Sequence, residues 1–188
     1  LEFRRVLFRS DLNYRGKLWS PKKAQSVMKP LMKYVDVCIC NEEDAEKVLG
    51  IIPSGTDVES GELSHAGYVH TAEMIYSKYG CKFVATTLRK SFSASRNGWE
   101  AMLYDAEAME SYFSREYDIQ IVDRVGSGDS FAAGLIYAMT QKMECQDVID
   151  FATAASCLKH TIEGDYNRTT VQDVQGLLRS GGNGRVQR

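Results

Sequence analysis

Several features that mark particular protein classes are scarce in this chain of 188 residues. It has no uninterrupted apolar run of the roughly 20 residues that a membrane-spanning helix needs. Its 23 lysines and arginines stand against 25 aspartates and glutamates, and a net charge of -2 predicts neither a nucleic acid nor a membrane surface as partner. The five cysteines are irregularly spaced and include no Cys-x-x-Cys pair, so we expect reduced thiols and a cytoplasmic location.

The pattern of apolar residues predicts a domain of the α/β class. Residues 35–40 and 82–88 are short apolar runs rich in β-branched side chains, which is typical of buried strands. The Asn97-Gly98 pair predicts a tight hairpin turn. Because strands alternate with helices, we expect a mostly parallel sheet flanked by helices. Helices are predicted over residues 22–34, 42–49, 69–79, 128–143, 145–160 and 170–178.

The two ends of the chain differ from its middle. Residues 1–10 lack an initiator Met and carry three arginines among large apolar residues, so we interpret them as a non-native junction from cloning or sequence assembly, with a short transit peptide as the alternative. Residues 180–188 are rich in glycine and are expected to be a flexible tail. The folded domain is therefore predicted over residues 11–179.

Residues 123–131 predict a glycine-rich turn between a strand that ends at Val122 and a helix that starts near Gly128. Glycines bring backbone N–H groups close to a ligand and a helix N-terminus adds partial positive charge, so the turn predicts a cradle for an anion such as a phosphoryl group. A carboxylate would repel that anion, so Asp129 is interpreted as a base that takes the proton of an attacking hydroxyl. The alternative is that Asp129 is only a helix N-cap. Phe131 excludes the Rossmann glycine pattern, and the Gly-Lys-Ser/Thr triplet of a P-loop is absent from the sequence.

Residues 123–133 resemble the C-terminal signature of the ribokinase, or pfkB, family of carbohydrate kinases. The residues that fall in register are Asp123, Gly126, Gly128, Asp129 and Phe131. The resemblance implies a ribokinase-like fold with Asp129 as the catalytic base. It also implies that Gly126, Ser127 and Gly128 supply the anion hole.

The same resemblance assigns two acidic positions to cations. Asn41-Glu-Glu-Asp44 is similar to the family's Asn-x-x-Glu motif, which organises ATP and Mg²⁺ largely through water. It implies that Asn41 binds the nucleotide and that Asp44, one methylene shorter than Glu, binds Mg²⁺ through water. An acidic first turn of a helix would explain the same residues. Asp123 is implied to help hold a monovalent cation such as K⁺.

Three more positions are implied at the nucleotide. Residues 84–88 are similar to the family strand that touches the nucleotide phosphates, with Thr87 in its Thr place. Arg89 stands where the family is glycine-rich, and it either binds phosphate or is a solvated residue at a strand end. Residues 151–155 resemble a segment whose Asn lies beside adenine, so Thr153 is expected near the base.

Residues 11–20 carry the information on substrate. They resemble the Asp-x-Asn-x-Arg segment of 2-keto-3-deoxygluconate kinases, which places Asn13 and Arg15, with Asp129, at the substrate. The guanidinium fork of Arg15 matches a carboxylate, so we expect a sugar acid, 2-keto-3-deoxygluconate, to be converted to its 6-phosphate. The open alternatives are an Arg15 paired with a surface carboxylate, a fructokinase or other carbohydrate kinase, and a nucleotide-binding remnant without catalysis.

The resemblance spans residues 11–178 and leaves out the family's N-terminal half, with its β-sheet lid and most of its sugar pocket. We therefore expect the C-terminal part of a kinase. It should have little activity alone, because positioning supplies about 7–11 kcal/mol in favourable cases. A sheet edge left exposed would favour association into a homo-oligomer.

Overall fold

The computed structural model describes residues 7–52 and 64–180. Residues 1–6 of the predicted junction and residues 181–188 of the predicted tail lie outside this part. The elements are β1 (Arg9–Asp11), α1 (Pro21–Met32), β2 (Val37–Cys40), α2 (Glu42–Asp44), the π-helical turn η1 (Ala45–Leu49), α3 (His65–Tyr79), β3 (Phe83–Ser91), β4 (Arg96–Asp105), β5 (Glu110–Phe113), β6 (Tyr117–Gln120), α4 (Ser127–Thr140), α5 (Cys145–Lys159) and α6 (Val171–Arg179). No helix in the described ranges is long and apolar enough to cross a membrane.

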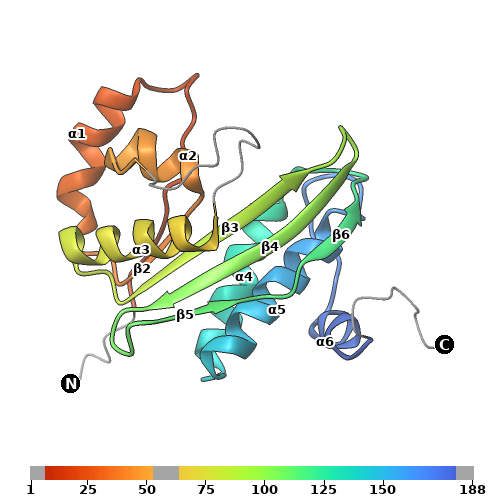
Figure 1. The fold of residues 1–188 in the computed structure, drawn as a ribbon. Helices are drawn as coiled ribbons and strands as arrows, with labels where there is room; N and C mark the ends of the chain where they lie inside the picture. Colours follow the sequence, from red (N-terminus) through yellow and green to blue (C-terminus); the bar gives the residue numbers. More distant parts are fainter. Residues whose placement is uncertain (1–6, 53–63, 181–188) are drawn as a thin grey trace, which may run out of the picture. The chain divides into compact units, whose positions relative to one another are not determined.

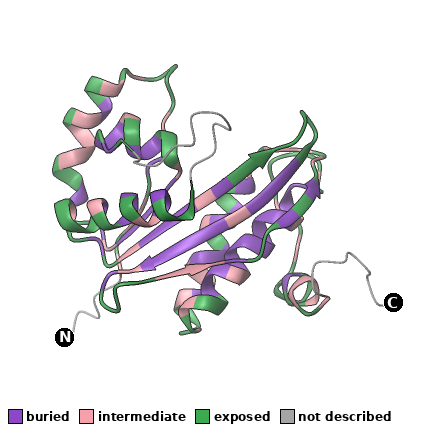
Figure 2. Cartoon of the chain, viewed as in Figure 1, coloured by how far each residue is buried: buried purple, intermediate pink, exposed green. Residues whose placement is uncertain are grey.

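The strands form one mixed sheet in the order β1-β2-β3-β4-β5, and β6 pairs with β4 (Figure 1). β1 pairs with β2 and β2 with β3 in parallel, whereas β4 and β6 are antiparallel. All four residues of β2 are buried, as an apolar run covered on both faces predicts (Figure 2). The predicted α/β class is confirmed. β1 includes Arg9 and Ser10 from the predicted junction, paired with Val37 and Cys38.

The chain divides into two compact units, the first of residues 1–86 with 103–111 and the second of residues 87–102 with 112–188. In the first unit, α1 begins at Pro21, one residue before the predicted range, and the Ser20 hydroxyl accepts from the backbone N–H of Lys23 at 3.4 Å. α1 packs against η1, and η1 ends at Gly50 in the left-handed conformation.

In the second unit, α4 packs along α5, and α6 packs against α5 (Figure 1). The two long helices approach closely at Gly134, where a Cβ would lie 3.0 Å from the Cα of Ala152. Most residues of α5 are buried (Figure 2). This pairing places the start of α4 beside the end of α5, where Ser156 bonds to Ser127.

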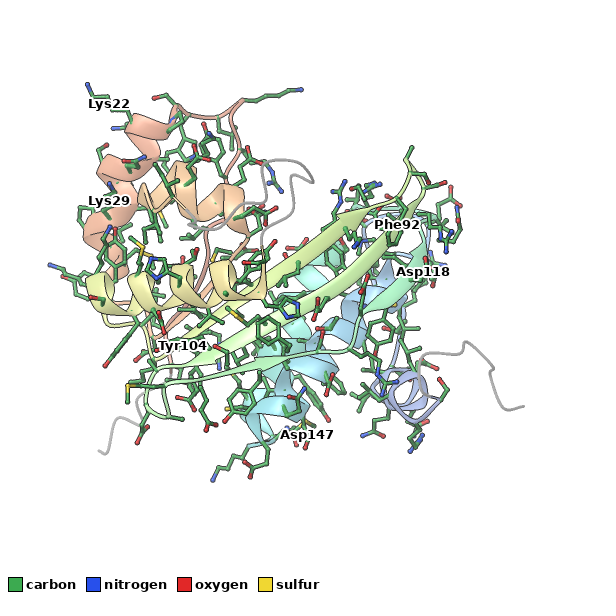
Figure 3. All side chains as sticks on the ribbon, viewed as in Figure 1. Lys22, Lys29, Phe92, Tyr104, Asp118 and Asp147 are labelled. Atoms are coloured by element: carbon green, nitrogen blue, oxygen red, sulfur yellow. The ribbon has the colours of Figure 1, made fainter. Side chains whose placement is uncertain are left out.

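The predicted turn at Asn97-Gly98 is wrong. Both residues lie inside β4, and Asn97 is fully buried opposite Ile119 of β6. The chain turns earlier, beside Phe92 at the outer end of the hairpin (Figure 3), where the Ser93 hydroxyl accepts from the backbone N–H of Arg96 at 3.0 Å. The turn is stabilised by the Ser93 hydroxyl, which accepts a backbone N–H of the turn itself, so no glycine turn is needed. Asn97 is placed in the strand instead because its side chain is buried there.

Candidate functional site

Gly126 gives the glycine-rich turn its shape. It is the N-cap of α4 and has φ 78°, in the left-handed region that glycine tolerates best. A Cβ at this position would lie 2.2 Å from the carbonyl oxygen of Asp165. The turn and the 165 loop are therefore so close that only glycine fits.

The first turn of α4 leaves backbone donors available. The N–H of Ser130 bonds to the Gly126 carbonyl at 2.9 Å and is the first N–H of the helix with an internal acceptor, so the N–H groups of Gly128 and Asp129 before it have none. Gly128 is exposed, and a Cβ there would meet no atom within 4 Å. Ser127 is instead buried, and its hydroxyl donates to the Arg124 carbonyl at 2.9 Å. The predicted residues are thus brought together, with open space on the side of Gly128.

Asp129 lies in this first turn as the third residue of α4. The helix is capped by Gly126 without a side-chain hydrogen bond, so the alternative that Asp129 is the N-cap is wrong. Its side chain is exposed, and no hydrogen bond or ion pair of its carboxylate is found within residues 7–52 and 64–180. An unpaired carboxylate next to unpaired N–H groups fits a base beside an anion cradle.

Asp123 closes the turn on its other side. One carboxylate oxygen accepts from the N–H of Val125 at 3.0 Å and the other from the N–H of Gly164 at 2.9 Å. These hydrogen bonds, from Val125 and then Gly164, lower the pKa of Asp123, and the charge of Lys159 lowers it further. Asp123 therefore ties the turn to the 164 loop.

Three residues at the end of α5 support the turn, and the sequence pattern did not single them out. The hydroxyl of Ser156 donates to the Ser127 carbonyl at 2.8 Å, and the His160 carbonyl accepts from the N–H groups of Val122 and Asp123 at 2.8 and 3.2 Å. Lys159 is fully buried and donates to the Ile162 carbonyl at 3.0 Å. In the sequence these residues end an ordinary helical pattern, so only their burial reveals them.

In the first unit, the ends of β1 and β2 bring four predicted residues together. The backbone N–H of Tyr14, which lies between Asn13 and Arg15, donates to one oxygen of Asp44 at 2.6 Å. The other Asp44 oxygen accepts from the N–H of Asn41 at 3.1 Å, and the Asn41 side chain accepts from the N–H of Asp44 at 2.8 Å. Asn13 holds a positive φ of 39°, which Asn tolerates better than most residues.

Asp44 is the buried centre of this group. Burial raises its pKa, against the opposing hydrogen bonds from Tyr14 and Asn41 and the charge of Arg15. Arg15 itself is exposed, and its guanidinium donates to the Tyr14 carbonyl at 3.0 Å. No group of three or more His, Cys, Asp or Glu in the described ranges is arranged to hold a metal ion. Both Asp44 oxygens already accept backbone N–H groups, so they are poorly placed to coordinate a metal ion directly. These residues fit an ion that is bound through water.

The remaining predicted nucleotide residues lie in the second unit. Thr87 is half-buried in β3, and Arg89 further along β3 is exposed. With the Asn97 amide oriented to satisfy both its polar groups, its oxygen accepts from Nε of Arg89 at 2.7 Å. Thr153 is fully buried in α5 and its hydroxyl donates to the Ile149 carbonyl at 2.8 Å. This placement gives Thr153 no exposed surface for a nucleotide.

Comparison with known proteins gives a consistent result. A family described as pfkB family carbohydrate kinase matches residues 5–171. A crystal structure of 2-dehydro-3-deoxygluconokinase from Thermotoga maritima is 46% identical with a TM-score of 0.85, over 93% of this chain and 51% of that one. A putative 2-keto-3-deoxygluconate kinase from Enterococcus faecalis is 28% identical with a TM-score of 0.78, over 98% and 53%. The 2-dehydro-3-deoxygalactonokinase of Haloferax volcanii is 26% identical over 171 residues, 91% of this chain and 46% of the relative.

These similarities confirm the predicted ribokinase-like fold. The chain spans about half the length of the relatives that it matches.

Proposed function

The chain belongs to the pfkB family of carbohydrate kinases, and from this premise we propose that it forms part of an enzyme that transfers the γ-phosphoryl group of ATP to a sugar hydroxyl. The observation that carries the proposal is the first turn of α4. There an unpaired Asp129 carboxylate stands beside the available N–H groups of Gly128 and Asp129 itself.

In the proposed reaction, a substrate hydroxyl oxygen attacks the γ-phosphorus and forms the new P–O bond. The bond from that phosphorus to the β,γ-bridging oxygen breaks, and ADP leaves with the electron pair. Asp129 accepts the hydroxyl proton as the attack proceeds. The backbone N–H groups of Gly128 and Asp129 stabilise the negative charge on the transferred group, and because these donors are fixed in place they need no reorganisation. Mg²⁺ bound with ATP would supply further charge neutralisation, and Asn41 and Asp44 are the residues proposed to hold it through water.

The proposed substrate is a sugar acid, 2-keto-3-deoxygluconate, and the product is its 6-phosphate. Arg15 supports this choice because its exposed guanidinium can receive a carboxylate, with Asn13 beside it. The names of the Thermotoga maritima and Enterococcus faecalis relatives favour the same substrate class. Thr87 and Arg89 are proposed contacts of the nucleotide phosphates. A fructokinase is the second candidate, which a neutral sugar as preferred substrate would favour.

Asp129→Asn in the full-length protein encoded by the gene tests the function. Removing the base should lower kcat by roughly 10²- to 10⁴-fold, while ATP binding measured by calorimetry stays intact. Asp147→Asn is a matched control, because Asp147 is the exposed third residue of α5, as Asp129 is of α4 (Figure 3). Equal activity of Asp129→Asn and the control contradicts the assigned base. ATP binding without phosphoryl transfer to any acidic or neutral sugar identifies a nucleotide-binding protein instead.

A further inference from the structure

Lys159 is a charged side chain without exposed surface. It is the last residue of α5, and its relative exposure is 0%. Lysine is almost never fully buried unless its charge is compensated. Its ammonium group has three donors, and the acceptor found for it in the described ranges is the Ile162 carbonyl at 3.0 Å. Packing alone therefore does not explain why a lysine occupies this position.

The surroundings of Lys159 are the glycine-rich turn and the 160–165 loop. An ideal Cβ on Gly126 would lie 3.3 Å from Cε of Lys159 and 2.2 Å from the Asp165 carbonyl oxygen. Asp123 is close enough for the Lys159 charge to stabilise its carboxylate, and it binds the N–H of Gly164 in the same loop. The Lys159 ammonium is thus buried, bonded to one backbone carbonyl and near one carboxylate, and oxygen atoms of these two kinds also bind monovalent cations.

We propose that the Lys159 ammonium is a built-in cation at the place where Asp123 was expected to help hold K⁺. A free cation beside a buried ammonium would be repelled, and the charge of Lys159 already stabilises the Asp123 carboxylate. The ammonium carries the same single charge and bonds to a carbonyl oxygen, as a bound ion would. Lys159 is accordingly a positioning residue, which keeps the turn and the loop in register while Gly128 and Asp129 face the substrate.

The consequence is that the protein has no specific need for K⁺. Thermal unfolding of the full-length protein in KCl and in tetramethylammonium chloride at equal ionic strength should give the same Tm. Lys159→Met keeps the length of the side chain and removes its charge, which should lower the Tm by several degrees in tetramethylammonium chloride. K⁺ should then restore part of the loss, because the vacated site offers the Ile162 carbonyl oxygen and lies near the Asp123 carboxylate. Lys78→Met, at an exposed position of α3, should show no response to K⁺.

A second test measures activity and is the part that rests on the proposed function. In it, kcat/KM of Lys159→Met should depend on K⁺, while kcat/KM of the wild type should not. A saturable rise of the wild-type Tm with K⁺ would show a separate ion site and overturn the proposal. A Lys159→Met protein that is destabilised equally in both salts would show a purely packing role and also overturn it. If the variant does not fold, the wild-type arm still decides. Because Tm requires no turnover, failure of this proposal is distinguishable from failure of the kinase assignment.

Discussion

The hydroxyl of Ser156 donates to the carbonyl oxygen of Ser127 at 2.8 Å, and both residues are buried. Ser156 lies in the last turn of α5 and Ser127 is the first residue of α4. The anion cradle proposed at the start of α4 is therefore aligned by a side chain 29 residues away. α5 therefore supports the glycine-rich turn at the start of α4.

Ser156→Ala should weaken this support. The Ser127 carbonyl would lose the second of its two donors and keep the helical one, and a typical hydrogen bond contributes about 0.5–1.5 kcal/mol. Urea unfolding should show a decrease of that size in the free energy of unfolding, and kcat should fall more than KM rises because the turn loses alignment. Ser26→Ala is the control, since Ser26 donates to the Lys23 carbonyl from an exposed position. Equal stability of the two variants would contradict the supporting role.

Gly126→Ala should be far more damaging than Gly80→Ala. Both glycines have a positive φ, 78° and 75°, so both substitutions carry the left-handed strain of about 1–2 kcal/mol. At Gly126 the new methyl also meets the Asp165 carbonyl, whereas at Gly80 no atom lies within 4 Å. We expect an additional loss of about 1–3 kcal/mol for Gly126→Ala, measured by chemical denaturation. Similar losses for both would show that the 165 loop yields easily.

His160 should make stability depend on pH. Burial lowers the pKa of His160, and the nearby charges of Arg124, Lys159 and Arg89 lower it further, against the bond to the Ser156 carbonyl. Its ring also packs edge-on against Trp99, with centroids 4.6 Å apart. The unfolded state takes up the proton first, so the stabilisation is complete above about pH 6.5 and is lost as the pH falls through the folded-state pKa.

Unfolding free energies measured from pH 7.5 down to pH 5 should therefore fall less steeply for His160→Gln than for the wild type. His70→Gln, which alters an exposed histidine on α3, should keep the wild-type slope. A His160→Gln slope parallel to that of the wild type would mean that His160 does not carry the effect.

Arg15→Ala tests the acidic character of the substrate. Loss of a charge-assisted hydrogen bond of about 1.5–3 kcal/mol should reduce kcat/KM for 2-keto-3-deoxygluconate by roughly 10- to 150-fold. A neutral sugar should be affected much less, because it offers no carboxylate. Lys17→Ala, at another exposed residue of the same loop, is the control. An equal loss for acidic and neutral sugars would contradict carboxylate recognition by Arg15.

Local patterns predicted the individual elements well where the cause is itself local. The helices predicted over residues 22–34 and 42–49 are examples, because Ser20 caps α1, Pro21 starts it and Gly50 ends η1, all through neighbouring backbone. Asn97-Gly98 failed because burial of Asn97 and its pairing with β6 outweigh turn propensity. Here tertiary packing has a larger effect than the local preference of Asn-Gly for a turn.

The candidate site shows the same division. Residues 123–131 predicted a glycine turn, a helix and an acid in its first turn, because each is specified within a few residues, whereas the preceding strand ends at Gln120, two residues before the predicted end. Whether Asp129 caps the helix or stands free within its first turn was decided by Gly126, which takes the cap in a conformation that the Asp165 carbonyl enforces from 39 residues away.

The sequence by itself determined the family, the fold class and the group of residues around Asp129, since these follow from contiguous motifs and periodicity. Only the tertiary structure decided that Asp44 is a buried acceptor of two backbone N–H groups, that Thr153 and Lys159 are fully buried and that Ser156 bonds to the Ser127 carbonyl. Burial and hydrogen-bond partners arise from residues far apart in the chain, and no local pattern of residue types encodes them.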